Sequence, residues 1–224
     1  MKGVLEDEIL HLPELVKNGG RAIDIGANDG IYSYALAKIC DVVEAFEPQP
    51  WCSERIAAYS KAFAPNINIH TVALSNYNRS TILHIPLIRG RLITSVASFK
   101  KSEYFDGNQD IEVLVHRLDD YQFKNVSLIK IDVEGHESEV LEGARETILR
   151  DKPVLIVEIE QRHLDNKPIN QVFSNILEFG YEGSFIYKKQ FIPLSKFIYE
   201  KYQEPFLDNV LSRDYIHNFI FKPL

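Results

Sequence analysis

The stretch "SLIKIDVEGHESEVLEGA", residues 127–144, decides the fold of this chain. It begins with a short apolar run typical of a buried strand and ends with a helical pattern whose apolar residues recur every three or four positions. Four ionisable side chains stand between the strand and the helix: Asp132, Glu134, His136 and Glu137. Charged groups are uncommon where a buried strand ends, so this strand end is a candidate functional site.

Further strand-and-helix units lie on both sides of this stretch. Buried strands are predicted over residues 21–27, 41–48, 66–74, 126–133 and 152–160, and two more, 181–187 and 215–223, close the chain. Because helical patterns follow most of these strands, the sequence predicts an α/β protein with a largely parallel sheet and helices on both faces. Ligands of such sheets bind at the carboxyl ends of the strands, near the switch point of the strand order.

The composition indicates a single globular domain over residues 1–224, with 45% hydrophobic and 25% charged residues. The 25 basic and 32 acidic residues give a net charge of −7, which does not provide the basic surface that nucleic acids need. No apolar run approaches the length of a membrane span, and the acidic start does not resemble a signal peptide. Cys40 and Cys52 form no disulfide or metal framework, so we expect a cytoplasmic protein.

Two segments depart from the strand-and-helix rhythm. Residues 1–20 are predicted as a helical lead-in, and residues 76–118 as a β-rich insertion with strands near 80–87, 92–98 and 110–118. The insertion is the best candidate for a substrate wall. Its Arg89 and Arg91 could meet a phosphate or carboxylate, or could simply form a solvated hairpin tip. Residues 187–213 could cover the site or form a contact between subunits of a homo-oligomer.

The ends of the first two strands carry the signature of a nucleoside ligand. In "DIGANDG", residues 24–30, Gly26 and Gly30 bracket a tight turn, and Asp24 could attract a cationic amine. The spacing differs from the G-x-G-x-x-G of dinucleotide sites, and a glycine-rich turn without a ligand is the alternative. Glu47 ends the second strand seventeen positions beyond Gly30, where an acid can hold both ribose hydroxyls. The alternative for Glu47 is a solvated acid before a proline turn.

Five segments together resemble the FkbM family of S-adenosylmethionine-dependent methyltransferases, in the same order along the chain. They are "AIDIGANDGIYSYALAK", "EAFEPQP", "HRLDDY", "LIKIDVEGHESEVLEGA" and "NFIFKP", spread between about Gly20 and Pro223. The resemblance implies a Rossmann-like class I methyltransferase fold, whose seven-stranded sheet is mostly parallel with the last strand antiparallel. Members of the family characteristically methylate hydroxyl groups of small molecules, especially sugars, glycans and polyketide-type natural products.

The resemblance also implies a set of residues that hold S-adenosylmethionine. The methionine end of the cofactor would be held by Asp24, Gly26, Asn28 and Gly30. Glu47 would hold its ribose, and Leu74 and Ser75 would border its adenine.

The predicted catalytic residues are Asp132, Glu134, His136 and Glu158. An alcohol is a poor nucleophile while protonated, so methyl transfer to a hydroxyl benefits from a base or a metal ion. Asp132 and Glu134 are two apart and would share one side of an extended strand end. The helix dipole would favour the neutral, basic form of His136, and Glu137 would be a partner of that dipole. The acids could also bind substrate hydroxyls, a divalent cation, or only Arg and Lys, and we predict no metal site.

We therefore expect an O-methyltransferase that acts on a small molecule, sugar or glycan. A base-modifying amino methyltransferase would carry a polar-Pro-Pro-aromatic turn after the fourth parallel strand, whereas this chain has "DVEG", residues 132–135. Two alternatives remain open at this point. One is a catalytically silent binding or assembly module that kept the fold, and the other is a nicotinamide-dependent oxidoreductase, which the missing third glycine disfavours.

Overall fold

The structure is a computed structural model that describes residues 6–16, 19–101, 105–165 and 167–224. The predicted lead-in over residues 1–20 and the predicted insertion over residues 76–118 therefore lie partly outside the described residues. Among the described residues, no helix is long and apolar enough to cross a membrane. Cys40 and Cys52 are both buried and unpaired by any disulfide.

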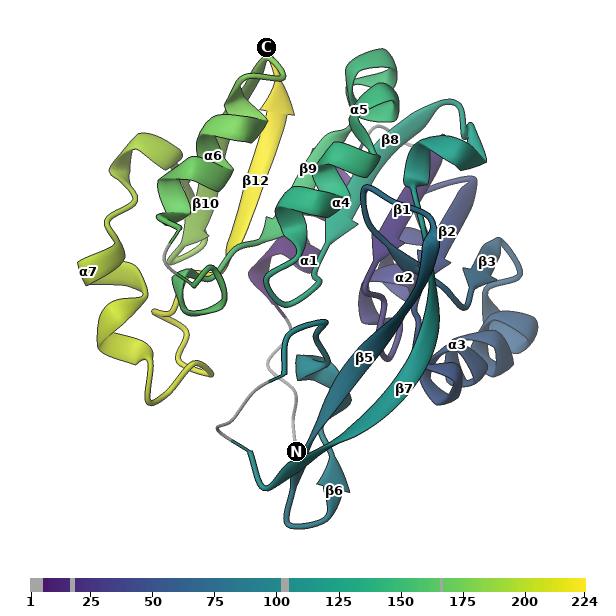
Figure 1. The fold of residues 1–224 in the computed structure, drawn as a ribbon. Coiled ribbons are helices and arrows are strands. Elements are labelled where there is room, and N and C mark those ends of the chain that lie inside the picture. Colours follow the sequence, from purple (N-terminus) through teal and green to yellow (C-terminus); the bar gives the residue numbers. More distant parts are fainter. Residues whose placement is uncertain (1–5, 17–18, 102–104, 166) are drawn as a thin grey trace.

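The main sheet confirms the predicted fold class (Figure 1). Its strands, in spatial order, are β11 (Gln190–Pro193), β10 (Tyr181–Tyr187), β12 (Asn218–Pro223), β9 (Val154–Glu158), β8 (Val126–Ile131), β1 (Arg21–Ile25), β2 (Val42–Phe46) and β3 (Ile67–His70). The neighbouring strands β3, β2, β1, β8 and β9 all run parallel to one another. The strand β12 lies between β9 and β10 and runs antiparallel to both. This is the predicted mostly parallel sheet whose last strand is reversed.

Within the described residues the sheet has eight strands and not the predicted seven. The additional edge strand, β11, forms a hairpin with β10, and the register pairs Tyr187 with Gln190. Lys188 and Lys189 form its two-residue turn, and both have positive φ, 50° and 64°. Such turns normally contain Gly, Asn or Asp, so two lysines gave no hairpin signal in the sequence.

Helices cover both faces of the sheet and enclose two hydrophobic cores. One face packs against α1 (Asp7–Leu15), α2 (Ile31–Leu36) and α3 (Pro50–Phe63). The opposite face packs against α4 (Glu137–Gly143), α5 (Arg145–Asp151) and α6 (Ile169–Leu177). Strand side chains alternate between the two cores, as Ala22 and Ile23 of β1 show. Burial of the strands on both faces explains their nearly continuous apolar sequences.

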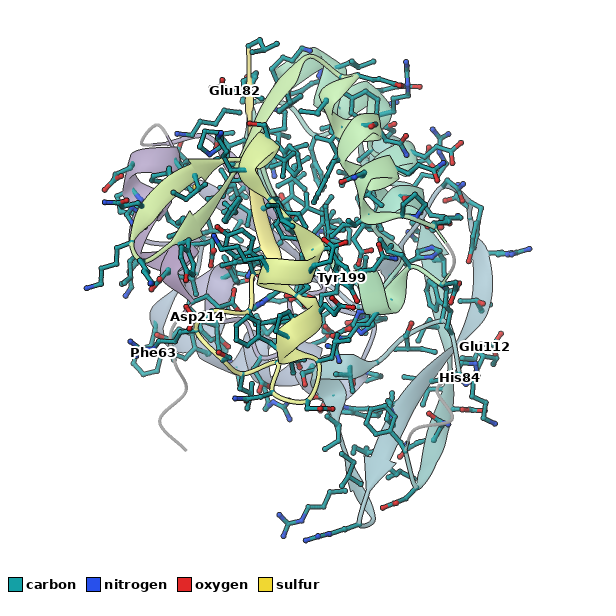
Figure 2. The ribbon with its side chains drawn as sticks, turned by 90° about the vertical axis from the view of Figure 1, so that its left-hand side faces the viewer. Phe63, His84, Glu112, Glu182, Tyr199 and Asp214 are labelled. Carbon is teal, nitrogen blue, oxygen red and sulfur yellow. The ribbon has the colours of Figure 1, made fainter. Side chains whose placement is uncertain are left out.

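The insertion forms a second sheet together with β4 (Ala73–Leu74), and β7 (Gly107–His116), β5 (Arg79–Ile88) and β6 (Arg91–Leu92) follow β4 in that order. The long β5–β7 pair extends from the body as an arm, which carries the labelled His84 and Glu112 in Figure 2. In the same view, Tyr199 of α7 (Tyr199–Tyr202) and Asp214 lie on the segment between β11 and β12, which faces the viewer.

The strand predicted near residues 92–98 is largely absent. Only Arg91 and Leu92 pair with β5, and a 3₁₀ turn follows at Thr94–Val96. Pro86 of β5 has no N–H to donate, so a second long ladder along this strand would be interrupted there. A single bridge between His84 and Ser98 returns the chain to β5. The segment between Leu92 and Ser98 leaves the arm and approaches the carboxyl ends of the main-sheet strands.

Candidate functional site

A cavity of about 340 Å³ opens at the carboxyl ends of β1, β2, β8 and β9. Eight of the eleven residues predicted for the site line it: Gly26, Asn28, Glu47, Leu74, Asp132, Glu134, His136 and Glu158. The other three, Asp24, Gly30 and Ser75, are not among its lining residues. Residues 94–99 of the insertion form part of its wall, whereas Arg89 and Arg91 lie on the arm and do not reach it. Most of the predicted site residues therefore gather around one cavity, and whether they bind or react stays a prediction.

The cofactor side of the cavity is built on the turn after β1. Gly26 has φ +79°, and a Cβ atom there would lie 1.8 Å from the carbonyl oxygen of Asp132. The end of β8 crosses this turn, and the Asp132 N–H donates to the Ile25 carbonyl at 3.0 Å. Because Gly26 has no Cβ atom, the end of β8 can pass this close to the turn. Gly30 (φ +81°) serves the start of α2, because a Cβ there would lie 2.7 Å from the Tyr34 ring.

Glu47 is held almost entirely by backbone groups. Its two carboxylate oxygens accept hydrogen bonds from the Asn28 N–H at 2.7 Å and the Gln49 N–H at 2.8 Å. The side chain is buried, and burial raises the pKa of Glu47 to about 7 despite these two donors. A carboxylate fixed in this way keeps further lone pairs for a diol.

Gln49 was missed by the sequence reading, and it has a polar atom without a partner. Its amide nitrogen Nε2 donates to the Thr94 carbonyl at 3.0 Å, which ties the segment after β2 to the insertion. Its Oε1 is buried, and no described residue donates to it. Gln49 also lines the cavity, so this acceptor is available to a hydrogen-bond donor on a ligand.

Asp24 lies behind the cavity wall and not on it. Its carboxylate accepts from the Ser33 hydroxyl at 2.6 Å, and burial raises its pKa to about 6. Ser75 is also fully buried, with its hydroxyl oxygen 2.8 Å from Nε2 of His136. The structure therefore does not bring the side chains of Asp24 and Ser75 to the cavity surface, although both stay close to residues that line it.

The acidic side of the cavity is formed by the turn after β8. The predicted extended geometry is wrong here, because the strand ends at Ile131 and Glu134 has φ +53°. The turn nevertheless gathers the acids, since carboxylate oxygens of Asp132, Glu134 and Glu158 lie within 4.8 Å of one another. The proximity that the sequence predicted is therefore present, but a left-handed turn produces it.

Each of these acids has a different environment. Glu134 pairs with His163, at 3.0 Å between Oε2 and Nδ1. Glu158 has His217 at 4.0 Å, and burial together with the charge of Asp132 raises the pKa of Glu158 well above its usual range. Asp132 has 31% of its side chain exposed and pairs with Lys130 at 3.6 Å. Asp132 is therefore the most accessible acid of the three.

Burial, in addition to the predicted effect of the helix dipole, favours the neutral form of His136. Burial of the ring is the main cause that lowers its pKa. The helix that it precedes, α4, has only seven residues. Its Nε2 is engaged with Ser75, and its ring packs edge-on against Phe99 at 4.9 Å. Glu137 is buried, accepts the Gly135 N–H at 2.9 Å, and has its pKa raised to about 7 by burial.

A second group of polar residues completes this side. Arg162 donates to both carboxylate oxygens of Glu160, at 2.7 and 2.9 Å, and the Tyr215 hydroxyl also donates to Glu160. Burial alone would raise the pKa of Glu160, but Arg162 and His163 hold it at about 2. Oxygen and nitrogen atoms of Glu134, Glu160 and His163 also lie within 4.8 Å of one another. Basic side chains of the protein thus already pair with these acids, and the predicted absence of a metal site stays a prediction.

A second cavity of about 580 Å³ adjoins the first. The two share the lining residues Glu6, Val210, Leu211, Tyr215 and His217. Glu6, which precedes α1, accepts from Tyr32 at 2.6 Å and from Asn218 at 2.9 Å. Val210 and Leu211 belong to the segment 187–213, which the sequence offered as a possible cover of the site. No local pattern places Glu6, Tyr215 or His217 there, so these three residues were not predicted.

One family model matches the sequence, that of the methyltransferase FkbM domain, over residues 24–183. No curated protein matches it significantly. Among solved structures, the chain is similar to the methyltransferase FkbM from Methylobacillus flagellatus, with a TM-score of 0.59 and 18% identity over 93% of this chain. The match covers 45% of that protein, so the chain spans less than half of its length.

Two further structures share the fold over nearly the whole of this chain. One is a methyltransferase-like protein of Streptococcus mutans in complex with SAH, with a TM-score of 0.52, 11% identity, and coverage of 96% of this chain and 94% of that one. The other is the precorrin-6y C5,15-methyltransferase of Geobacter metallireducens, with a TM-score of 0.50, 13% identity, and coverage of 96% and 86%. At such identities the likeness establishes the fold alone.

Proposed function

This chain belongs to the FkbM family of methyltransferases, and from that premise we propose that it uses S-adenosylmethionine to methylate a hydroxyl group of a small molecule, sugar or glycan. The observation that carries the choice of a hydroxyl is the position of Asp132. Its carboxylate lines the cavity, is partly exposed, and has Lys130 as its partner among the described residues. A carboxylate so placed can accept the proton of an alcohol.

The cavity fits the cofactor in size and in chemistry. Its volume of about 340 Å³ lies in the range of small-molecule sites. Glu47 is assigned to the ribose hydroxyls, and the unpartnered Oε1 of Gln49 offers a further acceptor in the same wall. The acids of the opposite wall suit a ligand that carries positive charge. When bound, S-adenosylmethionine supplies an activated methyl group on a sulfonium.

The residues of the protein must align the acceptor oxygen and receive its proton. Asp132 is assigned to orient the hydroxyl and accept that proton, with Glu158 next to it in the wall. Glu134 is oriented by His163 and is assigned to bind a neighbouring hydroxyl of the acceptor. His136 remains a candidate base, but its bond to Ser75 favours a role in shaping the wall.

A hydroxylated acceptor agrees with the groups around the acidic side. Carboxylates, Tyr215 and His217 can hydrogen-bond several hydroxyls, and the second cavity offers space for the remainder of the molecule. The insertion residues 94–99 are assigned to the wall that excludes water from the reacting groups. A catalytically silent module would retain the cavity but would show no turnover.

The test begins with calorimetric titration of S-adenosylmethionine and of NAD into the purified protein. Selective binding of S-adenosylmethionine, followed by transfer of a labelled methyl group to members of a saccharide panel, is the expected result. Binding without transfer to any hydroxylated acceptor would favour the silent module. Binding of NAD alone would overturn the assignment.

Asp132→Asn tests the central assignment. The amide cannot accept the proton as a carboxylate does, so turnover should fall roughly 100-fold to 10,000-fold, while the Kd of S-adenosylmethionine changes by less than about fivefold. His136→Asn is the matched control in the same turn, and its turnover should fall less than about tenfold. If His136→Asn proved the more damaging change, the proton acceptor would be His136.

A further inference from the structure

Lys130 is a charged residue in the interior of the central sheet. It lies in β8, between β1 and β9, and its side chain is 1% exposed. A lysine is rarely buried to this extent unless its ammonium group is paired. Its position therefore needs an explanation, and the cofactor and acceptor contacts proposed above do not supply one.

Three structural elements fix the ammonium group of Lys130. Its Nζ lies 3.1 Å from Oδ1 of Asn218 at the start of β12, and 5.0 Å from the centre of the Tyr32 ring in α2. Asn218 and Tyr32 both donate to Glu6, so the chain segment before α1 closes the same network. Nζ also lies 3.4 Å from the Ile131 carbonyl oxygen and 3.6 Å from Oδ2 of Asp132, a residue that lines the cavity.

Carboxylates outnumber cations around this group. Burial would lower the pKa of Lys130, but the charges of Asp132, Glu158, Glu6 and Asp24 hold it above the usual range. Ser33 donates to Asp24, and Tyr32 and Asn218 donate to Glu6, so hydrogen bonds already stabilise these two acids. Asp132 and Glu158 both face the cavity, with oxygens within 4.8 Å of each other.

We propose that Lys130 is a positioning residue of the reaction, which keeps Asp132 ionised and turned toward the acceptor hydroxyl. This inference rests on the proposed function. Two carboxylates so close cannot both ionise easily in a buried site, and Glu158 is the one whose pKa is raised well above its usual range. Lys130 is the cation next to the other carboxylate, with its Nζ 3.6 Å from Oδ2 of Asp132. Without that cation, the proton of the pair would move toward Asp132, which would then lose its capacity to accept one from the acceptor.

The charged and titratable groups that face Asp132 come from several elements. They are Lys130 of β8, Asp24 of β1, Tyr32 of α2, Glu134 in the turn and Glu158 of β9. Lys130 is the only permanent cation in this set, which is drawn from the described part of the chain. The protonation of Asp132 should therefore respond to Lys130 more than to any other single neighbour.

The experiment compares Lys130→Met with Lys152→Met, which removes a lysine at the end of α5 whose Nζ contacts the Phe179 carbonyl. The first readout is the titration of the Asp132 carboxyl carbon, followed by NMR in the protein without acceptor. In Lys130→Met the midpoint should rise by about one to two pH units, and in Lys152→Met it should not move. The second readout is the Kd of S-adenosylmethionine. Removing a cation near a sulfonium should leave this Kd unchanged or lower.

The third readout is the pH profile of turnover. The rising limb should move to higher pH by the same one to two units, so that activity is lost at low pH and largely recovered at high pH. A purely structural role would instead lower turnover equally at every pH and weaken cofactor binding. An unmoved Asp132 titration, or a loss of turnover that does not depend on pH, would overturn the assignment. Absence of cofactor binding in the unaltered protein would instead overturn the proposed function.

Lys130→Met leaves several buried acids without their cation and could fail to fold. Asn218→Ala gives a second test, because it removes the oxygen 3.1 Å from Nζ and keeps every charge. The double variant Lys130→Met/Glu158→Gln also removes the neighbouring carboxyl group, so that no second acid can exchange a proton with Asp132. We expect Asn218→Ala to shift the Asp132 titration in the same direction by less than one unit, and the double variant to restore it. An unmoved Asp132 titration in Asn218→Ala, together with a double variant that titrates like Lys130→Met, would exclude Lys130 as the positioning residue.

Discussion

The two sides of the cavity are built in different ways. On the cofactor side, the carboxylate of Glu47 is held by the backbone N–H groups of Asn28 and Gln49, within a turn whose shape depends on Gly26. On the acidic side, Asp132 and Glu134 are held by Lys130 and His163, whose side chains come from a strand and a distant turn. Backbone contacts fix a ligand position with few side chains, whereas side-chain pairs tune charge. The comparison suggests that one side binds and the other reacts.

Gly26→Ala should have the largest effect, because Gly26 lies where the two sides meet. The added Cβ would fall 1.8 Å from the Asp132 carbonyl oxygen, at a backbone φ of +79°. Steric overlap and backbone strain together should lower the free energy of unfolding by about 3 kcal/mol or more. Unfolding in urea, monitored by circular dichroism, measures this change.

Gly90→Ala is the matched control for that substitution. Gly90 has a similar φ of +71°, but no atom lies within 4 Å of the position of its Cβ. Only backbone strain remains, so the loss should be about 1 kcal/mol. Equal losses in the two variants would show that β8 does not constrain the turn.

Glu47→Ala should have the next largest effect, and it should act on binding alone. The variant loses the carboxylate assigned to the ribose hydroxyls, and the N–H groups of Asn28 and Gln49 lose their acceptor. The Kd of S-adenosylmethionine should rise roughly 10-fold to 100-fold, while turnover at saturating cofactor stays within about threefold. Glu54→Ala, on the exposed surface of α3, controls for loss of an acid. A fall in turnover at saturation would contradict the division between a binding side and a reacting side.

The smallest expected effect is a pH dependence of cofactor affinity. Burial raises the pKa of Glu47 from 4.5 to about 7. Ribose hydroxyls donate to the ionised form, so affinity should rise with pH through 7, by up to about tenfold between pH 6 and pH 8. The contribution of the same group to folding has the opposite sign, because stability present below pH 4.5 is lost as pH rises through 7. Calorimetric titrations at several pH values should show this slope, and Glu47→Gln should remove it.

The sequence by itself indicated the α/β class, the mostly parallel sheet and the strand ends at which to look for a site, and the resemblance to the FkbM family implied the reversed last strand. Strand periodicity and the alternation with helices are local patterns, and the parallel topology then brings the carboxyl ends of the strands to one edge. Gly26 and Gly30 after β1 and Glu47 after β2 could be picked out from the sequence because each of them follows the end of a predicted strand. A lysine inside the apolar run of β8 was also visible, and it was a missed signal.

Only the tertiary structure decided how the polar groups are paired. Lys130 meets Asn218 across 88 residues, and Glu6 meets Asn218 across 212. No local pattern encodes such pairs, because they depend on how strands and helices pack. The same limit applies to Asp24, which faces Ser33 and not the cavity, and to the hairpin turn at Lys188 and Lys189. Most strands and helices can be read from local sequence, whereas the partner of a buried charge is set by the packing of the whole chain.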